Sequence, residues 1–361
     1  MRKVMEIYCD DKKIYLCIHG NGQVSMLIIG RSRMGKTFFA SCLGANLIVQ
    51  GYIVHLIDLG DKWSAADKER LLSVGAVMRR VEKEGIVLTF NSVKEACACS
   101  KVIANALEFC SAKAISVLKQ AIRQLFTLYG QRFTLSDLTE YLEIWDYGST
   151  EDKEWQQKIL NRLDFGDEIP QITFCLDENN DFSTRSVIWD FSALDDTYTQ
   201  LIAYLINFCL LCQQKRKFRN GDVARKIFVI IDEFQVLDCD RKSVIGTCLV
   251  EGQKYGMALI LITQFLRGNF PDAVISQFKQ GGFRFYFRLT EEEAADVSRR
   301  LAKSAEERRT LYNRLANLPQ GHCLMLGCHT LGESKIVYDS PRFVEVKEVT
   351  NNIKITRREN I

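Results

Sequence analysis

The octapeptide from Gly30 to Thr37, Gly-Arg-Ser-Arg-Met-Gly-Lys-Thr, constrains the fold more than any other feature of this sequence. It fits the pattern G-x-x-x-x-G-K-[ST], in which a glycine-rich loop wraps a phosphate group. Mostly apolar residues at 25–29 predict a short buried strand before it, and the residues from Thr37 onwards predict a helix. Strand, loop and helix in this order predict a phosphate-binding loop, because the helix start offers free N–H groups to an anion.

The motif also assigns roles to its residues. Lys36 is expected to reach the β- and γ-phosphates of ATP, and Thr37 is expected to bind Mg²⁺. The whole loop is expected to contact the nucleotide, through Gly30, Arg31, Ser32, Arg33, Met34, Gly35, Lys36 and Thr37.

Composition limits the class of protein. Of 361 residues, 47% are hydrophobic and 26% are charged, which is typical of a globular chain that buries a core. The net charge of +3 is too small to indicate nucleic-acid binding by itself, so any DNA contact must come from local patches. Neither a run of 18 apolar residues nor a signal-peptide core occurs, so we expect a cytoplasmic protein without an integral membrane segment.

The thirteen cysteines are scattered, mostly within apolar runs, and the four histidines do not pair with them at zinc-site spacing. An odd count without a signal peptide also argues against a disulfide framework. We therefore expect buried thiols and no zinc site.

The alternation of strand and helix patterns predicts an α/β fold with a mostly parallel sheet. A hairpin is expected at 4–9 and 13–18, and core strands at 25–29, 51–58, 172–176, 186–191, 226–232, 258–263 and 283–289. An amphipathic helix is expected at about 195–215, a charged helical stretch at 291–317, and a closing strand pair within 321–346. The domains predicted are a β segment at 1–24, an ATPase core at 25–63 and 168–346, a helical insertion at 64–167 and a polar tail at 347–361.

Within the insertion, helical spacing is clearest at 112–129 and 135–144, with one strand-like piece at 85–90. Ser136 is the expected N-cap of the second helix.

A second anchor is the acid pair Asp232-Glu233, which follows five apolar residues at 227–231. At the end of a strand in a P-loop protein, such an aspartate supports Mg²⁺. We expect this role for Asp232, and we expect Glu233 to activate the attacking water as a general base.

Two further polar residues end predicted strands at the edge where ligands bind in open α/β sheets. Gln264 follows the strand 258–263 and could sense the γ-phosphate, or it could be an ordinary loop amide. Asp58 ends the strand 51–58 and could hold water or Mg²⁺, or it could be a turn or helix-cap residue.

These motifs, in this order, make the chain resemble the FtsK/HerA superfamily of DNA-pumping ATPases, and more the HerA side with its related type IV secretion ATPases. The resemblance covers about residues 25–346 and is most specific at Glu251–Gln264. The other matching segments are 30–37, 56–60, 232–234 and 318–327. The resemblance implies a RecA-like P-loop NTPase core, ATP and Mg²⁺ as cofactors, a homo-oligomeric ring of six subunits and translocation of double-stranded DNA.

The sequence departs from the family pattern in three places. Arg33 and Met34 replace small residues of the loop, and Gln253 stands where the family often has an arginine that acts on a neighbouring subunit. Lys254 cannot reproduce a planar guanidinium, so the expected substitutes are Arg284, Arg288 or Arg267. Only about 25 residues precede the first core strand, so the surface that docks a partner nuclease is expected to be reduced or missing.

Two basic clusters are candidates for DNA contact. The first, Lys215, Arg216, Lys217 and Arg219, is expected on a loop and has the better claim to phosphate contact. The second, Arg299, Arg300, Lys303, Arg308 and Arg309, is interleaved with glutamates on a helix, which favours a solvated face.

The leading hypothesis is an ATP-hydrolysing ring motor, a P-loop ATPase of the DNA translocase or helicase type. One alternative is a conjugation or secretion coupling ATPase that moves a DNA–protein cargo, with a secretion channel as partner instead of a nuclease. Another is an ATP-binding switch or scaffold with little hydrolysis, which the altered loop and Gln253 motivate.

Overall fold

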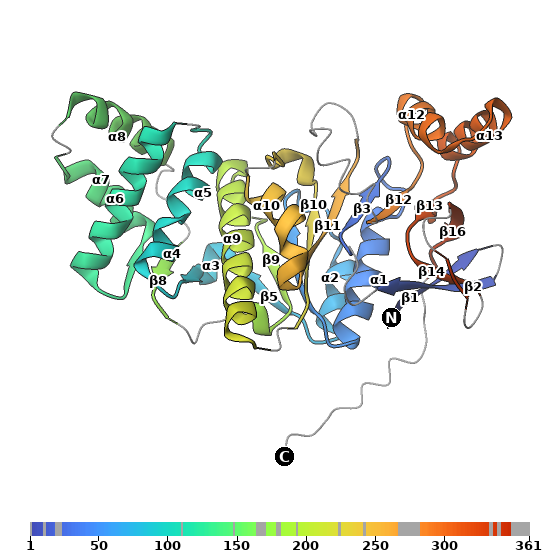
Figure 1. Cartoon of the computed structure of the whole chain (residues 1–361), viewed down its shortest axis with the longest axis horizontal. Coiled ribbons are helices and arrows are strands. Elements are labelled where there is room, and N and C mark those ends of the chain that lie inside the picture. Colours follow the sequence, from blue (N-terminus) through green and yellow to red (C-terminus); the bar gives the residue numbers. More distant parts are fainter. Residues whose placement is uncertain are drawn as a thin grey trace, which may run out of the picture.

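The computed structural model describes residues 2–9, 12–18, 24–109, 111–146, 149–163, 171–177, 182–192, 194–222, 225–240, 243–265, 282–331, 335–337 and 341–347. One long sheet runs through the described part of the chain, and helices cover both of its faces (Figure 1). The mixed α/β class expected from the sequence is confirmed.

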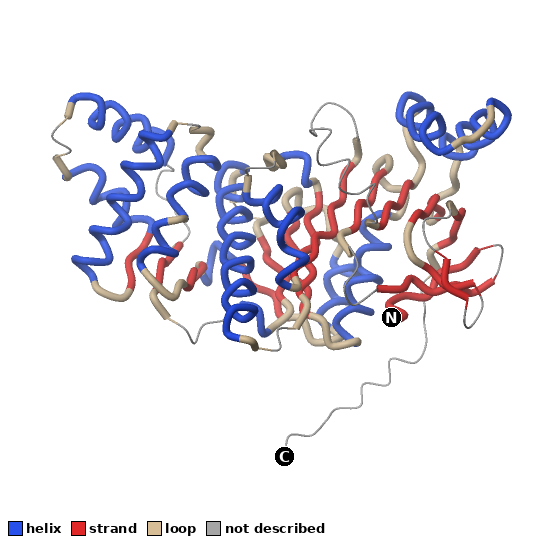
Figure 2. The backbone as a smooth tube through the Cα atoms, in the orientation of Figure 1, coloured by secondary structure: helices blue, strands red, loops and turns tan. Residues whose placement is uncertain are grey.

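The main sheet has thirteen strands. Their spatial order is β15 (Lys335–Val337), β14 (His329–Leu331), β2 (Lys12–Ile18), β1 (Arg2–Cys9), β16 (Arg342–Glu345), β13 (His322–Leu326), β12 (Phe283–Tyr286), β3 (Met26–Ile29), β11 (Met257–Thr263), β10 (Ile227–Asp232), β4 (Ile53–Asp58), β9 (Val187–Asp190) and β5 (Val77–Arg80). All neighbouring pairs from β12 to β5 are parallel, and those from β15 to β12 are antiparallel. Figure 2 shows most of the strands between the centre and the right of the view, and a few more among the helices at the left.

The parallel strands form because their residues are apolar on both faces. In β10, Ile227, Val229 and Ile231 belong to one core cluster, whereas Phe228 and Ile230 belong to the other. Successive side chains of a strand point to opposite faces, so this alternation places a packed core on each side of the sheet.

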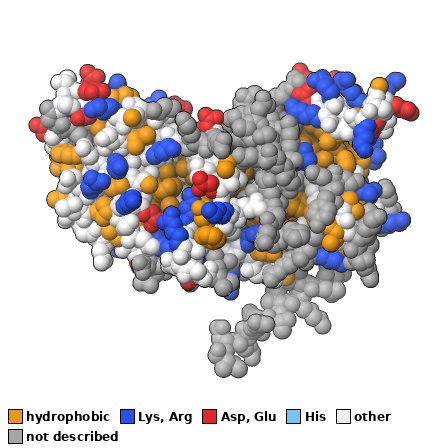
Figure 3. All heavy atoms as spheres, viewed as in Figure 1, with side chains coloured by type: hydrophobic (Ala, Val, Ile, Leu, Met, Phe, Trp, Pro, Cys, Tyr) orange, Lys and Arg blue, Asp and Glu red, His pale blue; other side chains and the backbone are white. Residues whose placement is uncertain are grey.

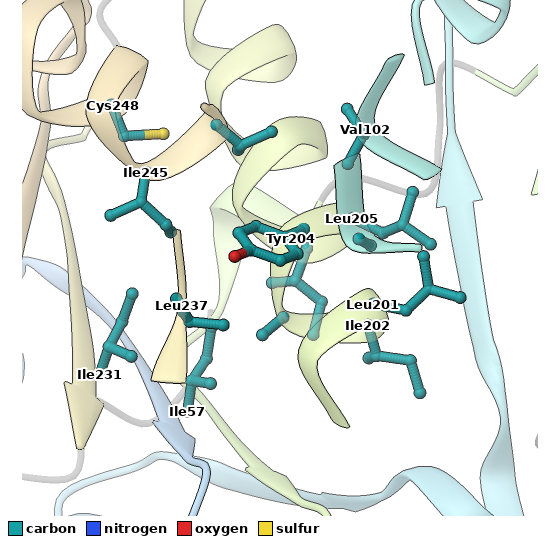
Figure 4. Close-up of a cluster of buried hydrophobic side chains, with 14 of the residues drawn as sticks. Ile57, Val102, Leu201, Ile202, Tyr204, Leu205, Ile231, Leu237, Ile245 and Cys248 are labelled. Atoms are coloured by element: carbon teal, nitrogen blue, oxygen red, sulfur yellow. The ribbon is translucent and has the colours of Figure 1, made fainter. Parts of the chain in front are cut away.

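Helices supply the other half of each core. Helices α1 (Lys36–Val49) and α2 (Ala65–Leu72) pack on one face. Helices α9 (Asp196–Asn220) and α10 (Val244–Glu251) pack on the other face. Figure 4 shows Tyr204 and Leu205 of α9 between strand residues such as Ile231 and the insertion residue Val102. Because α9 is buried on more than one side, it is not the amphipathic helix that its sequence pattern predicted.

The insertion contains a small second sheet and a group of helices. The sheet has the order β6 (Ile86–Thr89), β8 (Ile172–Cys175), β7 (Arg132–Thr134). The helices are α3 (Val81–Glu84), α4 (Val93–Cys97), α5 (Cys99–Ala106), α6 (Ala112–Tyr129), α7 (Leu135–Ile144) and α8 (Thr150–Leu163). The helices predicted at 112–129 and 135–144 are confirmed.

The predicted N-cap Ser136 is wrong, because α7 begins one residue earlier and Ser136 lies inside its first turn. Thr134 caps the helix instead. Its hydroxyl accepts a hydrogen bond from the N–H of Asp137 at 3.1 Å, and the Asp137 carboxylate accepts one from the N–H of Thr134 at 2.6 Å. This reciprocal pair is a capping box with aspartate in the third position.

Two strands join sheets other than those expected from their place in the chain. β8, expected in the core, is the central strand of the small sheet, and β5, from within the predicted insertion, is an edge strand of the main sheet. The pairing of β6 with β8 requires a glycine at position 85. A Cβ at this position would lie 2.5 Å from the carbonyl oxygen of Gln171, and its φ is +63°. The division of the chain into domains stays a prediction.

At the other end of the sheet, the charged stretch 291–317 forms two helices, α12 (Glu291–Leu301) and α13 (Ala305–Ala316). Ser304 caps α13 by accepting a hydrogen bond from the N–H of Glu307 at 3.1 Å. The closing strand pair is β13 with β16, joined through the hairpin β14–β15. Most of the predicted polar tail, 348–361, lies outside the described residues.

Candidate nucleotide-binding site

The loop between β3 and α1 has the geometry of a phosphate cradle. Gly30 and Gly35 have φ values of +151° and +100°, which favour glycine. A Cβ at Gly30 would lie 2.6 Å from Cβ of Phe287, so no larger residue fits there. The N–H of Arg31 donates to the carbonyl oxygen of Arg288 at 2.8 Å and fixes the loop to the segment after β12.

Helix α1 begins at Lys36 with Gly35 as its N-cap, and no side chain accepts from its first N–H groups. These groups and the positive end of the helix dipole therefore face the space above the loop, where an anion is favoured.

The ammonium group of Lys36 bridges the start of the loop. Its Nζ donates to the carbonyl oxygens of Gly30 at 2.6 Å and Arg31 at 3.0 Å. Burial lowers the pKa of Lys36, although the charges of Asp232 and Glu233 act in the opposite direction. A buried ammonium group at the loop suits a phosphate ligand, whose oxygens can accept charge-assisted hydrogen bonds from it.

The loop accommodates its two unusual residues, Arg33 and Met34. Arg33 adopts a left-handed conformation with φ of +62°, a position where the family resemblance implies a small residue. This conformation costs an ordinary residue roughly 1 kcal/mol. The Arg33 side chain is exposed, and the carbonyl oxygen of Met34 accepts a hydrogen bond from the N–H of Gly321 at 3.0 Å.

Asp232 lies at the end of β10, directly beside the loop. Its Oδ2 accepts hydrogen bonds from Thr37 Oγ1 at 3.4 Å and from Trp63 Nε1 at 3.0 Å. Burial, together with the nearby charges of Asp58 and Glu233, raises the pKa of Asp232 to about 6. A hydroxyl and a carboxylate oxygen at this separation fit Mg²⁺, which prefers oxygen ligands and keeps waters and substrate phosphates in its shell.

The next residue, Glu233, is aimed by an uncommon backbone conformation. Its φ is +53°, and its N–H donates to Oδ1 of Asp232 at 2.8 Å. The carboxylate accepts hydrogen bonds from Lys62, Gln264 and Gln235. Burial alone would raise the pKa of Glu233, but these three donors hold it below its ordinary value. Glu233 is therefore ionised at neutral pH, as a general base must be.

Gln264 connects the loop to Glu233. Its Oε1 accepts a hydrogen bond from Ser32 Oγ at 2.7 Å, and its Nε2 donates to Oε1 of Glu233 at 2.7 Å. The residue that the sequence singled out at the end of β11 thus joins the phosphate loop and the acid pair in one hydrogen-bonded chain.

Asp58 lies opposite Asp232 in the register of β4 and β10, and it organises the turn that follows β4. It accepts hydrogen bonds from the N–H groups of Lys62 and Trp63, both at 3.1 Å. Burial raises its pKa. These contacts favour the turn-residue alternative for Asp58.

Two further residues of the site, Lys62 and Trp63, were not expected from the sequence; they contact Glu233 and Asp232 respectively. Their only sequence signal is their position four and five residues after Asp58, in the turn that this aspartate caps.

The expected substitutes for the missing arginine lie in different places. Gln253 and Lys254 form part of the turn η3 (Gly252–Tyr255) before β11, at the edge of the sheet opposite the loop. Arg288 lies at the loop, but its Nε donates to the carbonyl oxygen of Leu318 at 2.6 Å. Arg284 lies within β12, and Arg267 lies outside the described residues. The identity of an arginine that acts in trans stays a prediction.

The first basic cluster was predicted to lie on a loop. It lies on a helix instead, because α9 continues to Asn220. Its cations meet partners there. Lys215 pairs with Glu251 at 2.7 Å, and Arg216 pairs with Glu95 at 3.3 Å. The second cluster lies on and between α12 and α13, where Figure 3 shows basic side chains at the upper right with acidic ones among them.

The cysteines of the described ranges are not paired in disulfides, and most are buried. Burial raises the pKa of the Cys239 and Cys248 thiols to about 12, so they stay protonated. Cys110 lies outside these ranges. Among the described residues, no group of three or more His, Cys, Asp or Glu side chains could hold a metal. Among the helices that the structure describes, none combines the length with the apolar character needed to span a membrane.

The fold is shared with solved structures of low sequence identity. The structure of VirB4 of Thermoanaerobacter pseudethanolicus matches with a TM-score of 0.64 at 14% identity, covering 92% of each chain. The plasmid coupling protein TrwB in complex with the GTP analogue GDPNP matches with a TM-score of 0.58 at 13% identity, covering 89% of this chain and 84% of that one. The same coupling protein with the ATP analogue ADPNP matches with a TM-score of 0.53 at 11% identity, covering 96% and 95%.

The sequence matches no protein-family profile and no curated protein sequence. The structural likeness confirms the fold that the FtsK/HerA resemblance implied, with a RecA-like P-loop NTPase core.

Proposed function

We propose that this protein is an ATP-hydrolysing motor that acts as a ring and moves double-stranded DNA, in the manner of HerA and FtsK. The observation that carries the proposal is the chain from Ser32 through Gln264 to Glu233, with both hydrogen bonds at 2.7 Å. A group that touches the phosphate loop and the general base together can report the presence of the γ-phosphate to the base.

In this proposal the loop N–H groups and Lys36 bind the phosphates of ATP. Glu233 accepts a proton from the attacking water, and its depressed pKa keeps it ready to do so. Gln264 orients that water. Thr37 and Asp232 would hold Mg²⁺, which neutralises phosphate charge when it is bound.

Nucleotide binding is supported from outside the chain as well. The coupling protein with the same fold is bound to GDPNP in one structure and to ADPNP in another. The movement of DNA and the hexameric ring rest on the family resemblance.

The test is ATP turnover of the purified chain with and without long duplex DNA, in wild type, Lys36→Ala and Glu233→Gln. We expect turnover that DNA stimulates. Lys36→Ala should lose ATP binding, whereas Glu233→Gln should bind ATP but turn it over roughly 10²–10⁴-fold more slowly.

Three results would contradict parts of this proposal. Tight ATP binding with negligible turnover in wild type would support the switch or scaffold alternative. Unchanged turnover in Glu233→Gln would refute the role assigned to the general base. A requirement for a protein bound to the DNA end would point instead to a coupling ATPase for DNA–protein cargo.

A further inference from the structure

A pocket of about 580 Å³ lies between α13, β16 and β1. Tyr8, Arg314, Asn317, Pro319, His322 and Phe343 are among the residues that line it, and we call it the side pocket. We propose that the side pocket binds the nucleoside end of the nucleotide, a purine base with its ribose. This inference rests on the proposed function, because it concerns the other end of the same ligand.

The first argument is position. The turn at Gly321 separates Pro319 from His322, and both of these residues line the pocket. The N–H of Gly321 donates to the carbonyl oxygen of Met34 at 3.0 Å, within the phosphate loop. A Cβ at Gly35 would lie 3.4 Å from the Cα of Gly321. One wall of the pocket is therefore in contact with the loop that would bind the phosphates.

The second argument is the chemistry of the walls. The guanidinium carbon of Arg314 lies 3.5 Å from the centre of the Phe343 ring, so a planar cation is stacked on an aromatic face. Such a stack presents a flat surface on which a nucleobase can lie. A volume of this size is within the range of small-molecule sites.

The third argument is the polar rim. Asn313 on α13, Asn317 directly after α13 and Glu345 on β16 line the pocket beside the stacked pair. Asn317 Nδ2 donates to the carbonyl oxygen of Asn313 at 2.9 Å, which fixes the orientation of its amide. Amide and carboxylate groups can exchange hydrogen bonds with base edges and ribose hydroxyls. A pocket with one planar stack and several polar groups suits a nucleoside better than an apolar ligand.

The experiment separates the two ends of the ligand by calorimetry, with Mg-ATP and with Mg-tripolyphosphate, which has the phosphates but no nucleoside. The variants are Asn313→Trp, which fills the pocket from an exposed helix position, and Arg314→Ala, which removes the stacked cation. Glu306→Trp, two turns earlier on α13 and outside the pocket, is the matched control.

We expect wild type to bind Mg-ATP at least about tenfold more tightly than Mg-tripolyphosphate. Asn313→Trp and Arg314→Ala should lose most of this difference while binding tripolyphosphate as wild type does, and Glu306→Trp should change neither affinity. Mg-GTP in place of Mg-ATP then shows which purine the rim prefers.

The inference is overturned if both variants bind Mg-ATP like wild type, or if they weaken both ligands equally. Equal affinity of wild type for the two ligands would also overturn it, while leaving the phosphate loop and the proposed function in place. If wild type binds neither ligand, the proposed function fails and this inference fails with it.

Discussion

Glu233 accepts hydrogen bonds from three side chains that come from three different segments, Lys62 after β4, Gln264 after β11 and Gln235 in the turn that follows β10. Only Lys62 carries a charge, and it is about half exposed. Its attraction is therefore partly screened by solvent. These contacts assign Lys62 a positioning role, because it acts through the carboxylate of Glu233.

We predict that Lys62→Met shifts the acid limb of the kcat–pH profile to higher pH. Burial favours the protonated form of Glu233, and the variant removes the cation that opposes this effect. The measurement is ATP turnover across pH in wild type, Lys62→Met and Lys62→Arg. The arginine variant should restore the wild-type limb, and an identical limb in all three would show that Lys62 does not hold the base.

Asp232 makes a prediction about stability, because its pKa in the folded chain is about 6, above the ordinary value of 3.8. A carboxyl group with a raised folded pKa stabilises the fold at low pH, and this contribution is lost as pH rises through 6. Without Mg²⁺, Asp232→Asn should therefore gain stability relative to wild type between about pH 5 and pH 7.5. The expected gain is ~1.4 kcal/mol.

Denaturant unfolding at both pH values, in the presence of a chelator, provides the measurement. A difference between wild type and Asp232→Asn that does not change with pH would mean that Asp232 ionises normally in the fold.

At the scale of elements, the strongest local signals predicted the structure well. The strand before the loop, helix α1 and the strands that end at Asp58, Asp232 and Thr263 were recognised, because each is a continuous apolar run that ends in polar residues. Parallel strands end at the same edge of the sheet, and this explains why Asp232, Glu233 and Gln264 could be expected to lie together.

Other features depend on contacts that are distant in sequence. The pairing of β8 with β6 rather than with the core follows from the close approach of Gly85 to Gln171. The burial of α9 depends on the insertion helices that cover it, and the contacts of Lys62 and Trp63 depend on how the turn after β4 folds. None of these features leaves a periodic pattern in the sequence.

The capping box of α7 makes a prediction at this scale. Thr134→Ala should lower the free energy of unfolding by about 1 kcal/mol, because the N–H of Asp137 in the first turn loses the hydroxyl oxygen that accepts its hydrogen bond. Ser136→Ala, the exposed first-turn residue of the same helix, should change it by less than about 0.5 kcal/mol. Urea unfolding of both variants shows which of the two residues caps the helix. A larger loss of stability for Ser136→Ala would mean that Ser136 is the N-cap, as the sequence suggested.

At the scale of the whole molecule, the proposed ring changes how the small net charge is interpreted. One chain carries +3, so a ring of six would carry six times that, or +18, around its channel. The partners of Lys215 and Arg216 within α9 and its neighbours reduce their availability for phosphate, so the DNA contacts of the ring are not assigned to them.

We predict that ATP and DNA together convert the 41.4 kDa chain to a species of six times that mass, about 248 kDa. Light scattering coupled to size exclusion measures this directly in wild type and in Lys36→Ala. The variant should stay small, because it lacks the bound nucleotide. A wild-type chain that remains a monomer or dimer would contradict the ring and would favour an assembly that needs a second kind of subunit.

The central claim is that ATP hydrolysis at the loop moves the protein along duplex DNA. The most direct test is the displacement of a labelled third strand from a long duplex, followed with ATP, with a non-hydrolysable ATP analogue and in Glu233→Gln. The proposal predicts that wild type displaces the third strand with ATP but not with the analogue, and that Glu233→Gln does not displace it. The time needed for displacement should increase with the length of duplex beside the third strand. ATP turnover without displacement under conditions in which the ring is assembled would contradict it.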